Sequence, residues 1–273
     1  MSNLLIFGPG YTASRIANSV GNLGWRVEAV DRVRLQQQGE VSALIAGSSH
    51  ILSSVPPQEE EDPVLSRFAA ALSSFGGWLG YLSATGVYGD TQGAWVDESA
   101  PVGRGRRNAR ANADLAWLAL GARVFRLPGI YGPGRSAFER LIAGGAYRVD
   151  QPGQMFSRIH VDDIVTAVIG AFDAPSGAYN IADDMPAPQG EVVAYAARLI
   201  GHPPPPLVHP DSLSPTARGF YSESRKVANG KAKRLLGWHP AYPSYRDGLR
   251  SLSANISPAK ASALPTAAIA DQR

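Results

Sequence analysis

The chain has 273 residues, of which 44% are hydrophobic and 18% charged, and it contains no cysteine. A chain of this length can bury a substantial core, and the lack of cysteine excludes disulfides, cysteine–zinc sites and a thiol nucleophile. The formal net charge of +3 is too small to predict a general attraction to nucleic acid.

Neither a membrane segment nor a metal site is expected. The apolar run at residues 4–7 is too short for a signal peptide or a membrane helix, and no other segment approaches a membrane span. The histidines do not have the spacing of metal ligands. We therefore expect a cytoplasmic protein that binds a small-molecule substrate, without a metal, a membrane or a nucleic acid as partner.

The first half of the chain alternates between strand and helix patterns. Apolar runs predict strands, and apolar residues at helical spacing predict helices. In chain order these are a strand over 4–7, a helix over 11–23, strands over 25–30 and 50–55, a helix over 64–75, a strand over 78–83, a helix over 104–120 and a strand over 123–127. Such alternation is typical of an α/β protein with a doubly wound parallel sheet of the Rossmann type.

After residue 127 the pattern is less regular. It predicts helices over 136–143, 161–172 and 190–200 and a strand near 179–181, whereas the proline-rich segment 202–210 is expected to lack regular structure. We therefore expect a dinucleotide-binding Rossmann domain over 1–127, joined by the strand near 179–181. Residues 128–250 are expected to form mainly a smaller C-terminal substrate lobe. Residues 251–273, rich in Ala, Ser and Pro, are expected to form a flexible tail.

A glycine-rich turn follows the first predicted strand. Gly8, Gly10 and Ala13 fit the pattern G-x-G-x-x-A, with Tyr11 and Thr12 between them. Gly8 allows a tight turn, Gly10 lets a pyrophosphate approach the backbone, and Ala13 lets the helix lie close to the sheet. The N–H groups of the helix N-terminus favour phosphate. The turn therefore predicts a dinucleotide site, and the alternative is a glycine turn that binds nothing.

The second predicted strand leads to Asp31. A carboxylate at this place accepts hydrogen bonds from the adenosine ribose and repels a 2′-phosphate, which favours NAD over NADP as the cofactor. Arg32 and Arg34 argue the other way, because arginine pairs with a 2′-phosphate. Further residues are included in the predicted cofactor site: Arg32, Ser54, Ser83, Pro128 and Gly129.

Four later motifs carry a family resemblance. They are L-S-A-T-G-V-Y-G at 82–89, R-L-P-G-I-Y-G-P-G at 126–134, R-I-H-V-D-D-I at 158–164 and L-G-W-H-P at 236–240. Together they resemble the extended short-chain dehydrogenase/reductase family of NAD-dependent epimerases and dehydratases, over roughly residues 3–250. The G-x-G-Y turn is more similar to an atypical branch of this family. The resemblance also implies a possible homodimer through the helix at 104–121.

The chain departs from this family at the catalytic residues. The resemblance implies Ser or Thr four residues before Tyr88, where this chain has Ala84, and a Tyr-x-x-x-Lys pair on the next long helix, which has neither residue. When Asp114 is aligned with the family's acidic helix residue, Arg106 and Arg110 take the places of the tyrosine and the lysine. Arginine keeps its proton, so Arg106 cannot be a general base.

Arg106, Arg110 and Asp114 are expected on one stripe of the helix. Two guanidiniums beside an oxidised nicotinamide require an anion between them, which favours an acidic or phosphorylated ligand. The alternative is a solvated arginine face in which Asp114 pairs with Arg110.

Thr85 completes the predicted catalytic set with Arg106 and Arg110. It follows a strand at the edge where doubly wound folds bind ligands, whereas Tyr88 and His160 are expected to be structural. We therefore expect an NAD(P)-binding epimerase, dehydratase or reductase that acts on a small polar substrate, anionic or similar to a nucleotide sugar. The alternative is a non-catalytic dinucleotide-binding protein that senses redox state, because a fold alone does not determine function.

Overall fold

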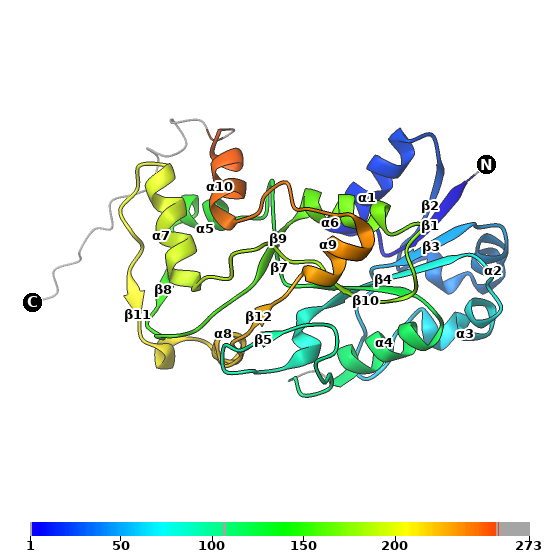
Figure 1. Cartoon of the computed structure of the whole chain (residues 1–273), viewed down its shortest axis with the longest axis horizontal. Coiled ribbons are helices and arrows are strands. Elements are labelled where there is room, and N and C mark those ends of the chain that lie inside the picture. The colour runs from blue at the N-terminus through cyan, green and yellow to red at the C-terminus, as the bar shows by residue number, and fades with distance from the viewer. Residues whose placement is uncertain (1, 106–107, 255, 257–273) are drawn as a thin grey trace, which may run out of the picture.

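A six-stranded parallel sheet forms the centre of the protein (Figure 1). The computed structural model describes residues 2–105, 108–254 and 256. The strands of this sheet are β1 (Asn3–Phe7), β2 (Arg26–Val30), β3 (His50–Ser53), β4 (Trp78–Ala84), β6 (Arg123–Leu127) and β10 (Gly177–Asn180). Every neighbouring pair is parallel, which confirms the predicted α/β class and Rossmann-type sheet.

The strand order β10-β6-β4-β3-β1-β2 creates a crevice beside β1. The chain leaves β1 for β2 on one side and then returns to β3 on the other side. In open α/β sheets such a reversal opens a ligand crevice at the carboxyl ends of the strands. The segments that begin with Gly8 and Ser54 follow β1 and β3, so both lie at this crevice.

Helices cover both faces of the sheet. One face carries α1 (Tyr11–Asn22) and α6 (Val161–Gly170), and the other carries α2 (Gln38–Ala46), α3 (Leu65–Ser73) and α4 (Asn108–Ala119). Alternate side chains of a strand point to opposite faces. Leu4 and Ile6 of β1 therefore join the core under α1 and α6, while Leu5 and Phe7 join the core under the other three helices.

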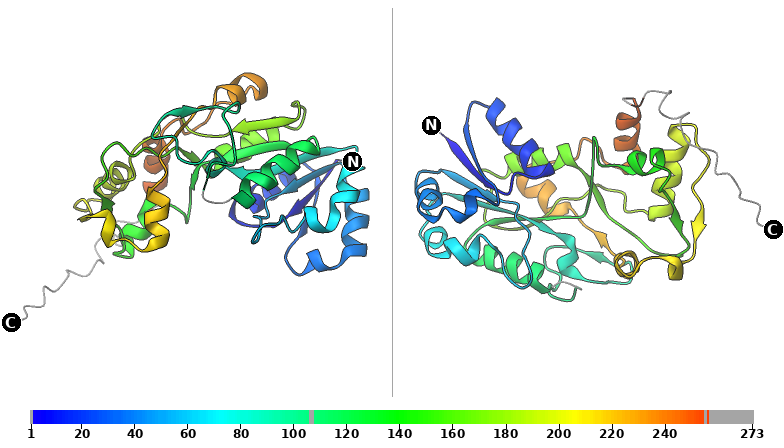
Figure 2. Two further views of the ribbon diagram at one scale, coloured as in Figure 1. Left: turned by 90° about the horizontal axis from the view of Figure 1, so that it is seen from below. Right: turned by 180° about the vertical axis from the view of Figure 1, so that it is seen from behind.

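A smaller lobe lies at one end of the sheet, at the left of Figure 1, and both views of Figure 2 show the same separation. Its helices are α5 (Ala137–Ile142), α7 (Gln189–Leu199), α8 (Pro215–Tyr221) and α10 (Tyr245–Ser253). An apolar core joins α5, α7 and α10. By contrast, α9 (Gly230–Leu236) contacts β10 and α6. The second half of the chain therefore contributes to both parts of the molecule.

Short elements complete the described structure. Three pairs of short parallel strands lie outside the central sheet: β5 (Trp95–Val96) with β12 (Lys226–Val227), β7 (Gly129–Tyr131) with β9 (Arg158–His160), and β8 (Arg148–Val149) with β11 (Leu207–Val208). Single 3-10 turns are η1 (Arg34–Gln36), η2 (Thr85–Tyr88) and η3 (Pro210–Ser212). No helix in the described part of the chain is long and apolar enough to cross a membrane.

Three expectations need correction. Residues 104 and 105 are not helical, and α4 is described from Asn108 onward. The segment 202–210 contains β11, which pairs with β8. Residues 251–253 belong to α10 and not to a tail, because Tyr245 and Leu249 hold that helix in the core of the lobe; residues 257–273 lie outside the described residues.

Candidate functional site

The glycine turn after β1 leaves its backbone open to a ligand. Gly8 has a φ of +77°, a conformation that favours glycine, and a Cβ there would lie 2.9 Å from Val55. At Gly10, by contrast, a Cβ would meet nothing closer than the Gly8 carbonyl oxygen at 4.0 Å. Helix α1 then begins at Tyr11 without a side-chain cap. Its first N–H groups are therefore free of a capping side chain, as a phosphate site requires.

A cavity of about 400 Å³ lies beside this turn. It brings together several residues of the predicted cofactor site, namely Gly8, Gly10, Asp31, Arg32 and Ser54. The Ser54 hydroxyl donates to the Gly8 carbonyl oxygen, so it stabilises the turn.

Asp31 holds the backbone in place at the edge of this cavity. Its Oδ1 atom accepts the backbone N–H groups of Val33 at 3.0 Å and Arg34 at 2.8 Å, which orders the segment after β2. The Arg34 guanidinium is paired with Glu28 and Glu40. Arg32 lines the cavity, and Arg34 does not.

The remaining predicted residues of the turn pack against protein. The Tyr11 hydroxyl donates to the Pro133 carbonyl oxygen at 3.1 Å, and the guanidiniums of Arg15 and Arg135 lie 5.0 and 5.6 Å from the centre of its ring. Thr12 is buried, and Ala13 lies in the core under α1, as its small size predicts. The turn is therefore attached to the loop that leads into the lobe.

A second cavity, of about 370 Å³, lies at the carboxyl ends of β4 and β6. It brings together four predicted site residues, Thr85, Arg110, Pro128 and Gly129. Thr85 is only 5% exposed, and Arg110 donates to the Tyr81 hydroxyl at 3.4 Å. Arg106 lies outside the described residues.

The ion pair considered between Asp114 and Arg110 is replaced by another. Asp114 is fully buried and pairs with Arg126, and it also accepts the Ser83 hydroxyl at 2.6 Å. The bond directs the Ser83 hydroxyl toward α4, and Ser83 lines neither cavity. Spacing along a single helix could not reveal this pairing, because Arg126 belongs to β6.

Tyr88 and His160 have structural contacts. The Tyr88 hydroxyl donates to Asn180 at 2.7 Å and accepts from Arg126 at 3.0 Å. His160 is 1% exposed, and its Nδ1 atom accepts the N–H of Asp162 at the start of α6. Burial lowers the pKa of His160, so the neutral ring is favoured.

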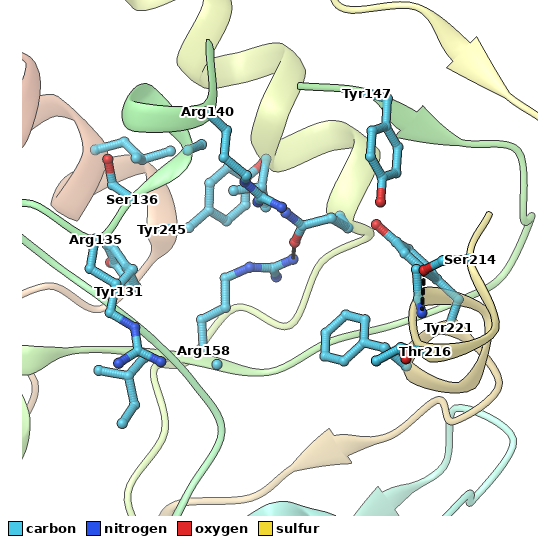
Figure 3. Close-up of a pocket in the computed structure, with 18 residues that line it drawn as sticks. Tyr131, Arg135, Ser136, Arg140, Tyr147, Arg158, Ser214, Thr216, Tyr221 and Tyr245 are labelled. Carbon is cyan, nitrogen blue, oxygen red and sulfur yellow. Dashed lines mark hydrogen bonds between the residues drawn. The ribbon is translucent and has the colours of Figure 1, made fainter. Parts of the chain in front are cut away.

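A third cavity, of about 660 Å³, lies between the paired strands β7 and β9 and the lobe helices α5, α7, α8 and α10 (Figure 3). It continues from the second cavity, because both are lined by Gly129, Arg158, Gln189 and Phe220. No role is predicted for Arg158 from the sequence motifs, although a charged residue in the short buried strand β9 indicates a special environment.

Arg158 is a buried cation held by neutral acceptors. Its Nη1 atom donates to the carbonyl oxygens of Phe156 and Ala187, and its Nη2 atom donates to Gln189, each at 2.9 Å. Burial lowers the pKa of Arg158 to about 10, so the side chain stays charged at neutral pH. The junction of the two cavities therefore carries a positive charge.

The residues of the first cavity fit a nicotinamide dinucleotide. The space above Gly10 is open to a pyrophosphate, the uncapped start of α1 favours its charge, and Asp31 lies where a ribose hydroxyl would be bound. The nicotinamide end of such a dinucleotide would be surrounded by residues of the second cavity, which lies at the same edge of the sheet.

Solved structures similar to this chain share its fold. A functionally unknown conserved protein from Silicibacter pomeroyi DSS is 40% identical, with a TM-score of 0.85 over 93% of this chain and 99% of that chain. The dTDP-glucose 4,6-dehydratase of Bacillus anthracis, solved with NAD, is 17% identical, with a TM-score of 0.75 over 93% of this chain and 96% of that chain. No family model matches the chain.

One curated relative is matched over part of its length. A 3-diazoavenalumate denitrifying reductase from a Streptomyces species is 34% identical over 151 residues. The match covers 51% of this chain and 48% of the reductase, so the chain spans about half of that relative.

The fold is that of the extended short-chain dehydrogenase/reductase proteins, since the similar solved structures are NAD-dependent epimerases and dehydratases. At 40% identity over almost the whole of both chains, the protein belongs to the same family as the conserved Silicibacter pomeroyi protein.

Proposed function

We propose that this protein is a nicotinamide-dinucleotide-dependent oxidoreductase or epimerase that acts on a small anionic substrate. One observation carries the proposal: Thr85 and Arg110 line one cavity at the carboxyl edge of a sheet whose first turn fits the cofactor. The reductase named among the relatives favours reduction over epimerisation or dehydration. NAD is the proposed cofactor, because Asp31 lies in the cavity that the adenosine would enter.

Thr85 and Arg110 have different proposed roles. A nicotinamide bound here would supply the hydride acceptor or donor. The Thr85 hydroxyl would donate a hydrogen bond to the reacting oxygen of the substrate, at the end of β4 where the chain turns into η2. The Arg110 guanidinium would attract an anionic substrate to the cavity and stabilise negative charge that develops during the reaction.

The experiment is a turnover screen with two variants. Absorbance of the reduced cofactor is followed with small carboxylic acids and nucleotide sugars, and products are analysed directly because an epimerase returns its hydride. Thr85→Val keeps the buried shape and removes the hydroxyl, so we expect kcat to fall at least ~100-fold. Arg110→Ala should raise KM roughly 10-fold or more.

A matched control separates these effects from general damage. Arg198→Ala removes an exposed arginine of α7 that lines none of the three cavities, and it should retain the parent's kinetics. Full turnover by the Thr85 and Arg110 variants would refute the assigned roles. If the protein binds NAD but direct analysis detects no product from any compound, a redox-sensing protein is favoured instead.

A further inference from the structure

All the charged side chains that line the third cavity are positive. It is lined by Arg135, Arg140 and Arg158, and none of the described residues that line it is Asp or Glu. Arg135 packs over the Tyr11 ring, with its guanidinium 5.6 Å from the ring centre, so its charge lies toward the dinucleotide turn. Figure 3 shows Arg140 and Arg158 extending toward each other from opposite sides of the cavity.

Arg158 has donors to spare for one small anion. A guanidinium has five N–H groups, and three of those of Arg158 bind acceptors among the described residues, in Phe156, Ala187 and Gln189. The remaining two match the two oxygens of one carboxylate. The Asp183 carboxyl, whose charge would compensate that of Arg158, has a pKa that burial raises to about 8, so it is largely neutral at pH 7. An anion at Arg158 would therefore compensate a buried charge.

Aromatic side chains form the other wall of the cavity. Phe220 lines both continuous cavities and yet exposes 51% of its surface. One face of its ring stacks on Phe156, with ring centres 4.8 Å apart and planes inclined by 11°. Figure 3 also shows the hydroxyls of Tyr147 and Tyr221 pointing toward each other at the cavity. A flat ring and a cation thus lie at the same junction, next to the proposed reaction site.

We propose that this cavity binds an aromatic carboxylic acid, with Arg158 holding the carboxylate, Arg140 supporting it and Phe220 contacting the ring. This proposal names the substrate class of the site described above and rests on that proposed function. A nucleotide sugar would bring a diphosphate, which an arginine also binds through two N–H groups, so it is the competing ligand class in the test.

Calorimetry on the full chain, saturated with NAD, tests the ligand class. The probes are cinnamate, the matched neutral cinnamyl alcohol, UDP-glucose and inorganic phosphate. We expect cinnamate to bind at least ~10-fold more tightly than the alcohol, as a charge-assisted bond requires. Equal affinities of acid and alcohol, or UDP-glucose binding in preference to cinnamate, would overturn the proposal.

Variants assign the contacts. Arg158→Gln should abolish the preference for the acid, but it also removes buried hydrogen bonds. Arg140→Gln and Phe220→Ala are therefore measured as well, because both residues are exposed and their loss should disturb the fold less. Arg140→Gln should reduce cinnamate affinity without changing that of the alcohol. Phe220→Ala should reduce both affinities roughly 3-fold to 10-fold. Arg218→Gln, an exposed arginine on α8 that does not line the cavity, is the matched control.

The result is independent of catalysis. If cinnamate binds with these dependences but no hydride transfer occurs with any acid, the reaction proposed above fails and the ligand class stands. If turnover occurs only with compounds that lack a carboxylate, and Arg140→Gln and Phe220→Ala bind cinnamate like the parent, the ligand class fails and the reaction stands.

Discussion

The carboxylate of Asp114 forms a two-point ion pair with the guanidinium of Arg126, and both side chains are hidden from solvent. The Nη2–Oδ1 and Nε–Oδ2 distances are 2.7 and 3.1 Å. Arg126 also donates to Tyr88, and Ser83 donates to Asp114. The network therefore connects α4 and β6 to the strand and turn that flank Thr85.

Loss of Arg126 should destabilise the fold strongly. Arg126→Met leaves the Asp114 carboxylate buried without its cation, and breaking such a pair typically costs about 3–5 kcal/mol of unfolding free energy. Urea denaturation measures the change. Lys233→Met is the matched control, because its ion pair with Asp184 is partly exposed and should be worth less than about 1 kcal/mol. A loss no greater than the control's would mean that the pair is not stabilising.

Gly10→Val should remove dinucleotide binding while the protein stays folded. A Cβ at Gly10 has open space around it and the backbone there is extended, so valine causes no clash in the free protein. The branched side chain would occupy the space proposed for the pyrophosphate. We expect calorimetry to detect no NAD binding, with thermal unfolding close to that of the parent.

The companion substitution at Gly8 should behave differently. Gly8 has a positive φ and a Cβ there would clash with Val55, so Gly8→Val should lower the unfolding temperature as well as NAD binding. If Gly10→Val binds NAD as tightly as the parent, the pyrophosphate lies elsewhere.

Strands β1, β3 and β4 were predictable because each is a local, largely apolar run that is buried in the sheet. Helix α2 was not, since its apolar residues do not form one clear stripe; Val41 and Ile45 are buried in it. The partners of Asp114 also escaped prediction. Helical spacing compares residues along one helix, whereas Arg126 approaches Asp114 from a neighbouring strand.

The sequence predicted that the residues proposed for the cofactor lie close together, but not that the residues proposed for the substrate do. Gly8, Gly10 and Asp31 belong to one strand–turn–helix–strand unit, so their proximity follows from local order. Arg140, Arg158 and Phe220 belong to α5, β9 and α8, and they come together only when these elements pack around the third cavity.

Asp31→Asn should weaken discrimination between the two dinucleotides. We expect the parent to bind NAD more tightly than NADP by about 1–3 kcal/mol, because a carboxylate and a 2′-phosphate repel each other. Asparagine keeps the Oδ1 acceptor that Val33 and Arg34 use and removes the charge. The difference in binding free energy between NAD and NADP should therefore narrow, with little change in the free energy of unfolding. Paired titrations measure both affinities. Tighter NADP binding by the parent would assign control of this site to Arg32 and Arg67, which line the same cavity.

Asp183 should make the protein less stable as pH rises. It is 1% exposed, and its Oδ2 atom has no hydrogen-bond partner among the described residues. Burial raises its pKa to about 8, against about 3.9 in an unfolded chain. Between these values the folded state binds a proton that the unfolded state has released. The associated stability is complete below about pH 4 and is lost as pH rises through 8, at up to about 1.4 kcal/mol per pH unit.

Asp183→Asn should remove this dependence. Urea denaturation between pH 7 and 8.5 isolates the effect, since Asp163, whose burial raises its pKa to about 6, and His50 and His160, whose burial lowers theirs, titrate below this window. The free energy of unfolding of the parent should fall between pH 7 and 8.5, and that of Asp183→Asn should change less. The stability of the variant relative to the parent should therefore increase with pH. Asp163→Asn, the matched control, should keep the parent's slope there. Parallel profiles for the parent and Asp183→Asn would show that the Asp183 carboxyl does not carry the raised pKa.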